Sequence, residues 1–276
     1  MNTFKERCIE LRKQDYTLNE IVKITGRPKT SIYEYIYDIP LSKDKLQIIR
    51  LANGIRARSI ALARKGKSDR NFRRFTEWNV DNVTLLAHLI FDGTVNGTSC
   101  IYNNRNLSLL NKVEICMKYI YDYEPKRYLN KRTGVYRISY HNVALSDYLE
   151  IKLQELLRDV NLLTKALKRE FVKAFFDDEG CVDFRPKRNL RQVRGYQKNV
   201  TVLFLIQTLL SNFDIKSRIV KPNEVVISGK ENLQKFRKEV NFSPGVKLNG
   251  NRSNSIWKKP LDKRLLLDQA IKSFKK

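Results

Sequence analysis

Two short apolar segments of the sequence each end in an acidic residue followed by glycine. The first reads Leu-Leu-Ala-His-Leu-Ile-Phe-Asp-Gly over residues 85–93, and the second reads Val-Lys-Ala-Phe-Phe-Asp-Asp-Glu-Gly over residues 172–180. Asp92 and Glu179 occupy the same place in the two segments. If both segments are helical, each carboxylate lies at a helix C-terminus, where the helix dipole disfavours negative charge. The repetition therefore predicts a compensating cation, most economically a bound divalent ion, although a water-exposed acid would explain either segment alone.

The residues available as ligands favour magnesium over zinc. The chain has four cysteines with no close pair, and its histidines are His88 and His141. Zinc sites need clustered Cys and His side chains, so we expect free, buried thiols instead. The scarcity of histidine also disfavours nucleases that use a histidine as general base. A metal ion here would be held mainly by oxygen atoms, which suits Mg²⁺.

The elements that position these acids are predicted to be two buried helices. Both segments are apolar on nearly every side, unlike an amphipathic surface helix. Ala87 and Ala174 fall at equivalent places, where a small side chain permits two backbones to approach closely, and the final glycines suit a left-handed helix end.

The stretches that follow the two segments also repeat. Each segment is followed by two strands, a helix, two strands and a final helix. The predicted ranges are 94–106, 107–121, 127–140 and 146–160 in the first half, and 184–194, 198–213, 218–228 and 231–242 in the second. The sequence thus predicts an α/β (α+β) fold of two αββαββα repeats with pseudo-two-fold symmetry.

At these residues the sequence resembles the LAGLIDADG homing endonucleases in their single-chain form with two motifs. The two segments match the nine-residue motif, with Asp92 and Glu179 on its last acid, while Ile90 and Phe91 depart from it at the sixth and seventh positions. The resemblance spans about residues 81–260. It implies that the motif helices pack side by side, that both acids bind Mg²⁺, and that each serves hydrolysis of one DNA strand.

The resemblance also implies a DNA-binding surface and one further catalytic residue. The strands of such a protein lie in the major groove of DNA. The groove-facing candidates are Arg127, Lys131, Arg132 and Arg137 in the first half, and Arg185, Lys187, Arg188, Arg191 and Arg194 in the second. Family members often add a lysine that polarises the attacking water, and Lys247 is the candidate here. The first half offers no convincing counterpart.

The N-terminal residues resemble a helix-turn-helix DNA-binding module. Residues 17–26 begin with a Thr-x-x-Glu capping box and end on glycine, which predicts a short helix. Pro28 suits the first turn of a second helix over residues 29–39, and a helix over residues 4–13 precedes both. The resemblance implies that the second helix enters the major groove with Lys29, Thr30, Ser31 and Tyr33 exposed. A purely structural helical hairpin is the alternative.

The predicted domains are a helix-turn-helix module (1–50), a basic linker (51–78), a first repeat (79–165) and a second repeat (166–276). The formal net charge is +25, and most of the positive surplus lies after residue 80. Double-stranded DNA is therefore the expected partner, with intron RNA as a second possibility. No segment has the apolar length of a membrane span or a signal peptide, so we expect a cytoplasmic, nucleoid-associated monomer.

Other functions remain open at the level of sequence. A non-cleaving transcription regulator or an intron RNA maturase could use the same fold, and a helix-turn-helix regulator could use the repeat to bind a partner or ligand. The presence of both acids favours cleavage over these alternatives. Asp147 with residues 150–152 superficially fits a restriction-type nuclease motif, but apolar spacing over residues 149–160 is helical and that motif needs strands.

Overall fold

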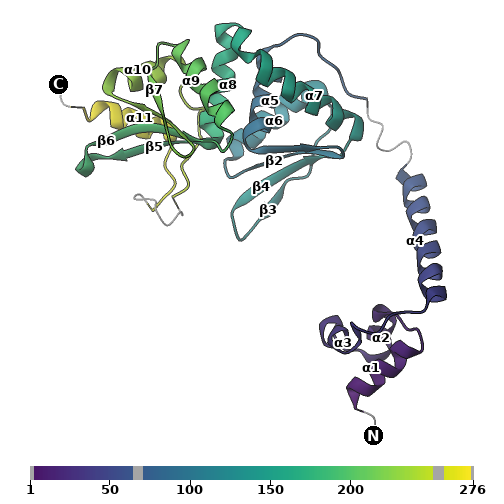
Figure 1. Ribbon diagram of the computed structural model, residues 1–276. Coiled ribbons are helices and arrows are strands. Elements are labelled where there is room, and N and C mark those ends of the chain that lie inside the picture. Colours follow the sequence, from purple (N-terminus) through teal and green to yellow (C-terminus); the bar gives the residue numbers. More distant parts are fainter. Residues whose placement is uncertain (1–2, 65–70, 251–257, 275–276) are drawn as a thin grey trace. The chain divides into compact units, whose positions relative to one another are not determined.

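The computed structural model describes residues 3–64, 71–250 and 258–274. The chain divides into two compact units, Met1–Ser68 and Asp69–Lys276 (Figure 1). No helix in the described ranges is long and apolar enough to cross a membrane.

The N-terminal unit contains three short helices around a small core. The helices are α1 (Phe4–Lys13), α2 (Leu18–Thr25) and α3 (Lys29–Ile36). Capping boxes begin α1 and α2, and Gly26 ends α2 in the left-handed conformation with φ 68°. Helix α3 begins at Lys29 as predicted, with Pro28 as its N-cap and not in its first turn, and it ends three residues before the predicted end. The core is formed by Cys8, Ile21, Ile32 and Ile36.

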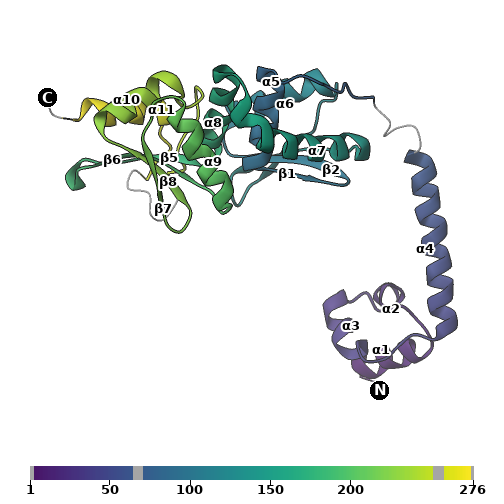
Figure 2. The ribbon, with the colours of Figure 1, turned by 45° about the horizontal axis from the view of Figure 1, so that its top comes forward.

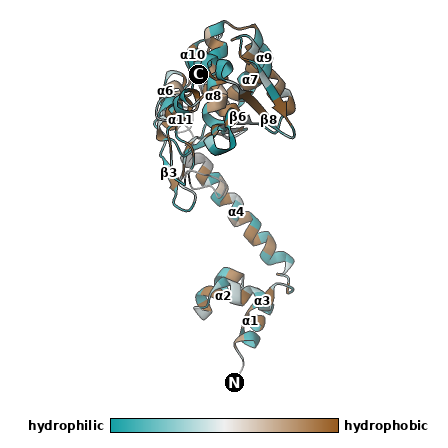
Figure 3. Cartoon of the chain, turned by 90° about the vertical axis from the view of Figure 1, so that its left-hand side faces the viewer, coloured by the Kyte–Doolittle hydropathy of each residue, from teal (hydrophilic) through white to brown (hydrophobic). Residues whose placement is uncertain are grey.

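The segment predicted as a linker is mostly regular or packed structure. Helix α4 (Lys43–Arg64) runs through the predicted boundary at residue 50, because residues with good helix propensity continue beyond it. Hydrophobic and hydrophilic residues alternate around α4 (Figure 3), and Leu51 and Ile55 are exposed. Residues 65–70 of the predicted linker lie outside the described residues. In the second unit, the Tyr148 hydroxyl accepts a hydrogen bond from Phe75 N (2.8 Å) and donates one to Phe75 O (2.9 Å).

The second unit consists of two repeats with the predicted order of elements. The first contains α5 (Val80–Phe91), β1 (Gly93–Asn96), β2 (Ser99–Asn104), α6 (Leu107–Ile120), β3 (Tyr128–Asn130), β4 (Val135–Tyr140) and α7 (Val143–Asp159). The second contains α8 (Lys165–Glu179), β5 (Gly180–Arg185), β6 (Leu190–Tyr196), α9 (Val200–Ser211), β7 (Ser217–Val220), β8 (Glu224–Ser228) and α10 (Lys230–Glu239). The predicted mixed α/β fold of two αββαββα repeats is therefore confirmed. A further helix, α11 (Lys263–Lys272), was not predicted.

Each repeat builds one antiparallel sheet, and the two sheets have equivalent strand orders. These orders are β1-β2-β4-β3 and β5-β6-β8-β7. Helices lie on one side of both sheets (Figures 1 and 2), and the buried strand residues, such as Val193 and Ile227, face them. We call the other side the open face of each sheet.

Helices α5 and α8 pack against each other between the two sheets (Figure 1). Both are largely buried, and the small residues Ala87 and Ala174 lie inside this core, as the apolar pattern predicted. This pairing brings the last turns of the two motif helices together.

The glycines that follow the motif helices do not adopt the predicted left-handed conformation. Gly180 has φ −91° and ψ 156°, and Gly93 is absent from the glycines with positive φ. The structure instead requires glycine because the first strand residue passes close to the helix backbone. A Cβ atom would lie 2.5 Å from Leu89 O at Gly93 and 2.4 Å from Phe176 O at Gly180. The same close approach occurs in both repeats.

Candidate metal and nucleic-acid site

The two predicted metal ligands stand at equivalent helix ends. Asp92 is the C-cap of α5, and its N–H donates to His88 O at 3.1 Å. Glu179 is the last residue of α8, and both acids are partly exposed. Gly93 and Gly180 then open the strands β1 and β5.

Asp92 sits in an environment that disfavours its charge. Burial raises the pKa of this carboxyl to about 7, and the nearby Asp178 carboxylate adds to the rise. The Asp92 Oδ2 atom accepts a hydrogen bond from Asn104 Nδ2 at 2.7 Å. No hydrogen bond to Oδ1 is made within the described ranges. Asp92 therefore presents one held oxygen atom and one that can take a ligand.

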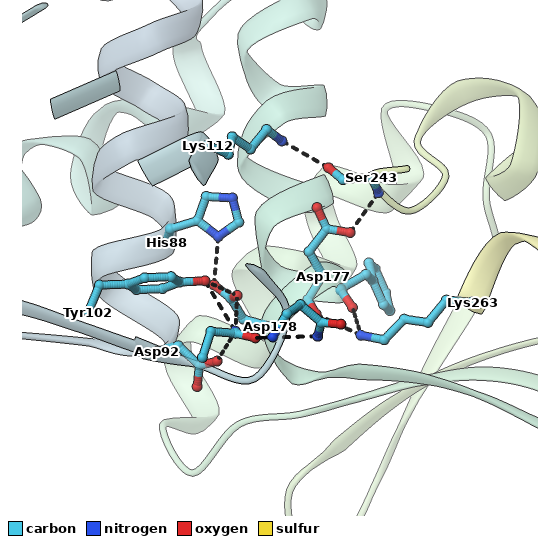
Figure 4. Close-up of polar contacts among 11 residues, drawn as sticks. His88, Asp92, Tyr102, Lys112, Asp177, Asp178, Ser243 and Lys263 are labelled. Atoms are coloured by element: carbon cyan, nitrogen blue, oxygen red, sulfur yellow. Dashed lines mark hydrogen bonds and ion pairs between the residues drawn. The ribbon is translucent and has the colours of Figure 1, made fainter. Parts of the chain in front are cut away.

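Asp178 is a buried acid whose importance the sequence did not indicate (Figure 4). Its Oδ2 lies 2.8 Å from His88 Nδ1, and its Oδ1 accepts from the Tyr102 hydroxyl at 2.7 Å and from Asn104 Nδ2 at 3.2 Å. Burial raises the pKa of Asp178 well above its usual range, and the Tyr102 hydrogen bond opposes that rise. The sequence around Asp178 does not reveal this role, because its hydrogen-bond partners His88, Tyr102 and Asn104 belong to the other repeat.

The cation that compensates the end of α8 is a buried lysine (Figure 4). Lys263 Nζ donates to Phe176 O at 3.0 Å and to Asp177 O at 2.6 Å. Burial lowers the pKa of Lys263, while Asp177 and Asp178 counteract that effect. Asp177 is itself buried and accepts a hydrogen bond from Ser243 N at 2.7 Å. Asp177 and Asp178 thus both have hydrogen-bond partners within the protein, although the buried Asp177 Oδ2 atom has none among the described residues.

Lys247 lies in a loop of the second repeat that is tied to the first. Its N–H donates to Asn106 Oδ1 at 2.8 Å, and Asn106 Nδ2 donates to Lys247 O at 3.4 Å. Asn106 N in turn donates to Asn104 Oδ1 at 2.9 Å. The Lys247 backbone is therefore linked to the residue that holds Asp92, and its side chain is exposed.

The basic residues predicted in the first sheet fall into two groups. Lys131 and Arg132 are exposed in the turn between β3 and β4, and Arg137 is exposed on β4. Register places Arg137 opposite Asn103, on the open face, because the neighbouring Ile138 and Tyr102 face the core. Arg127 instead pairs with α6, where its Nε donates to Glu114 Oε1 at 2.8 Å.

The second sheet places its five predicted basic residues in three settings. Lys187 and Arg188 are exposed in the short 3₁₀ turn Pro186–Arg188. Arg185 and Arg194 both contact Asp183, at 2.8 and 3.0 Å, on the open face.

Arg191 lies on the core side of β6, two residues from the buried Val193. Its Nε donates to Ser273 Oγ at 2.6 Å, and its guanidinium lies 4.9 Å from the centre of the Phe274 ring. It therefore fastens the C-terminal segment.

In the N-terminal unit, the four predicted contact residues are all exposed on α3. Lys29, Thr30, Ser31 and Tyr33 lie on the surface, while Ile32 and Ile36 face the small core.

Among the comparisons with known proteins, a family model matches the second repeat. The family model described as the LAGLIDADG-like domain matches residues 166–241. No curated protein sequence matches the chain.

Solved structures similar to the chain include a mesophilic variant of the homing endonuclease I-DmoI, with 18% identity, a TM-score of 0.47, and coverage of 60% of this chain and 96% of that one. An I-DmoI variant in complex with its target DNA in the presence of Mg is 18% identical, with a TM-score of 0.45 and coverage of 58% and 96%. The N-terminal LAGLIDADG domain of DUF199/WhiA is 13% identical, with a TM-score of 0.46 and coverage of 62% and 88%.

The solved structures are too distant to assign an activity to this chain. The family match runs from α8 into the residues after α10 and includes Glu179. The chain therefore contains a LAGLIDADG-like domain at residues 166–241, and the predicted relationship to the LAGLIDADG family is confirmed on that segment.

Proposed function

We propose that this protein is a site-specific endonuclease that hydrolyses one phosphodiester bond in each strand of duplex DNA, with Mg²⁺ as cofactor. The observation that carries the proposal is the placement of Asp92 and Glu179 at equivalent ends of two packed, buried helices. Because the two repeats supply one acid each, a single chain suffices for two cuts, and we propose that it acts as a monomer.

The donor set fits Mg²⁺ bound jointly with DNA. Within the described ranges, no group of three or more His, Cys, Asp or Glu side chains is arranged to hold a metal ion. Mg²⁺ commonly uses one or two carboxylates and completes its shell with water and substrate phosphates. The raised pKa of Asp92, about 7, marks a place where a cation would stabilise the ionised carboxyl. When bound, the ion would lower the pKa of the attacking water and stabilise charge on the phosphate.

The protein's own residues would bind and orient the duplex. The exposed cations of the open faces and their turns, Lys131, Arg132, Arg137, Lys187 and Arg188, would contact phosphates or base edges. Arg185 and Arg194 are paired with Asp183 on the open face, and there they would face the groove.

Two of the predicted contacts drop out of the proposed surface. Arg127 pairs with α6, and Arg191 fastens the C-terminus. Lys247 would act on the attacking water at the Asp92 site, because its loop is joined to Asn106. In the N-terminal unit, Lys29, Thr30, Ser31 and Tyr33 of α3 would contact a further stretch of DNA.

The test is selection of bound duplexes from a random library in Ca²⁺, followed by transfer to Mg²⁺ and separate detection of nicks in each strand. Wild type should cut both strands, Asp92→Asn should lose one cut, and Glu179→Gln should lose the other, while both variants still bind. Glu231→Gln is a matched control, because this acid is exposed on α10 and should change neither cut. Specific binding without any cut by wild type would refute the proposal.

A second candidate is a DNA-binding regulator that does not cleave. It is favoured by the hydrogen bond from Asn104 to Asp92 and by the pKa of about 7, since both allow a stable metal-free carboxyl. This candidate predicts salt-sensitive duplex binding that is identical with and without Mg²⁺.

A further inference from the structure

A buried polar network connects the two repeats beside the first acid (Figure 4). Its members are His88, Asp92, Tyr102, Asn104 and Asp178. Asp178 belongs to the second repeat, and the other four belong to the first. His88 lies one helical turn before Asp92 on α5, so the last turn of this helix is attached to α8 at two points.

The Asn104 amide is the bridge between the two carboxylates. Its Nδ2 donates to Asp92 Oδ2 at 2.7 Å, to Asp178 Oδ1 at 3.2 Å, and contacts the Tyr102 hydroxyl at 3.2 Å. Its Oδ1 accepts from Asn106 N at 2.9 Å. Because a backbone N–H can only donate and a carboxylate can only accept, this orientation of the amide is the one that satisfies all partners. Asn104 therefore holds the Asp92 side chain in one direction.

The second repeat differs at the positions of Tyr102 and His88, while Gln197 takes the place of Asn104 and accepts a hydrogen bond from Asn199 N at 3.1 Å. Equivalent strand pairing, Gly93 with Tyr102 and Gly180 with Gly195, places Gly195 where the first repeat has Tyr102. The motif position of His88 is taken by Phe175, and a Cβ atom on Gly195 would lie 2.4 Å from the Phe175 ring.

The two motif helices also meet through unlike pairs. Asp178 faces His88, whereas Phe91, at the equivalent motif position, faces Phe175 with 5.1 Å between ring centres. The contacts of Asp178 with His88 and Tyr102 thus involve the first motif helix and its strand, and residues of other types take these two positions in the second repeat.

We propose that Asp178 is a positioning residue that acts through Asn104 to orient Asp92, so that the first-repeat site is set by a side chain of the second repeat. The inference rests on the proposed function in one respect, which is that Asp92 holds the metal ion. Partners that orient a metal-binding carboxylate change metal affinity or activity by about 10- to 100-fold when they are removed.

The experiment compares Asp178→Ala with the near-isosteric Asp178→Asn, which retains an acceptor for Tyr102 and Asn104. Mn²⁺ binding to the complex of each variant with selected duplex DNA is measured by calorimetry, and nicking of each strand is measured against Mg²⁺ concentration. Asp178→Ala should weaken one ion site by about 10- to 100-fold and raise the Mg²⁺ requirement of the strand assigned to Asp92. The strand assigned to Glu179 should change by less than about two-fold, and Asp178→Asn should restore most of the loss.

The outcomes separate this inference from the proposed function. If wild type binds two ions but never nicks, and Asp178→Ala weakens one site, the endonuclease proposal fails and the positioning role stands. If wild type nicks and Asp178→Ala affects both strands equally or neither, the positioning role is overturned. A general loss of folding would lower the melting temperature of Asp178→Ala and impair both strands together. Tyr102→Phe, which removes one donor to Asp178, should then show a smaller effect confined to the Asp92 strand, and its absence would overturn the inference.

Discussion

Three consecutive carboxyl groups at the end of α8 illustrate how surroundings assign different tasks to similar side chains. Asp177 accepts a backbone hydrogen bond, Asp178 has three side-chain partners, and Glu179 ends the helix at a partly exposed position. The buried Lys263 supplies positive charge to this end of the helix. The three neighbouring acids thus differ in exposure, and Glu179 is the partly exposed one that the proposed function assigns to the metal ion.

A pH-dependent contribution to stability is expected from His88. Burial lowers the pKa of this imidazole to about 4, below the value of about 6.5 in an unfolded chain. The unfolded state therefore binds more protons between pH 4 and 6.5, and the contribution of His88 is complete above pH 6.5 and lost as the pH falls toward 4. The free energy of unfolding of wild type minus that of His88→Asn, measured by urea titration, should rise across this window by up to about 3 kcal/mol.

The matched control is His141→Asn, because His141 is exposed. Its difference from wild type should stay below about 0.5 kcal/mol, as for ordinary surface substitutions. A His88→Asn difference that is flat from pH 4 to 7 would contradict a neutral, buried imidazole.

At the scale of elements, the turn from helix to strand is the tightest constraint in each repeat. The first residue of β1 and of β5 passes against the carbonyl oxygen four residues earlier, so a side chain cannot be accommodated without moving backbone. This reason for glycine differs from the usual helix-ending role, and it ties the acid before each glycine to a fixed place between helix and strand.

Substitution of these glycines should therefore be costly in both repeats. Gly93→Ala and Gly180→Ala are each expected to destabilise the second unit by about 3 kcal/mol, the upper part of the range for overpacking. Gly97→Ala serves as the control, since a Cβ atom there meets nothing within 4 Å and φ is not positive. Thermal unfolding would measure the three variants, and equal melting temperatures for Gly93→Ala and Gly97→Ala would show that the close approach relaxes easily.

The elements that could be predicted from sequence are those defined by local patterns. Capping boxes marked the start of α2, and uninterrupted apolar segments marked α5 and α8. Helix α11 was missed in the sequence because the burial of its apolar residues, including Leu266 and Leu267, depends on packing against the second sheet. The hydrogen-bond networks around Asp178 and Lys263 could not be predicted for the same reason, since their partners lie 74 to 90 residues away along the chain. The side of the sheet on which each arginine lies depends on register, which composition does not specify.

For the whole molecule, the proposed function divides the large positive charge into cations that would contact DNA and cations that stabilise the fold. Arg137 is exposed on the open face, whereas Arg191 is engaged with Ser273 and Phe274 on the core side. Both are arginines on central strands, so substituting each by alanine compares a cation of the open face with a cation of the core side.

Arg137→Ala should weaken duplex binding and reduce the slope of log K against log salt by about one, as expected for loss of one phosphate contact. Arg191→Ala should leave the salt slope unchanged and lower the melting temperature of the second unit instead. Fluorescence anisotropy at several salt concentrations, together with calorimetry, would measure both effects. An Arg191→Ala variant that loses affinity for DNA while its stability is unaltered would return Arg191 to the proposed DNA-binding surface.

The unlike pairs between the motif helices, Asp178 with His88 and Phe91 with Phe175, make the two repeats complementary parts that can no longer replace each other. A chain built from two copies of the second repeat would bury each Asp178 against the ring of Phe175, without the imidazole of His88. A chain built from two first repeats would set Phe91 against the imidazole of His88 and leave that ring without its carboxylate. Each repeat is therefore shaped to pack against the other repeat, and neither could pack equally well against a second copy of itself.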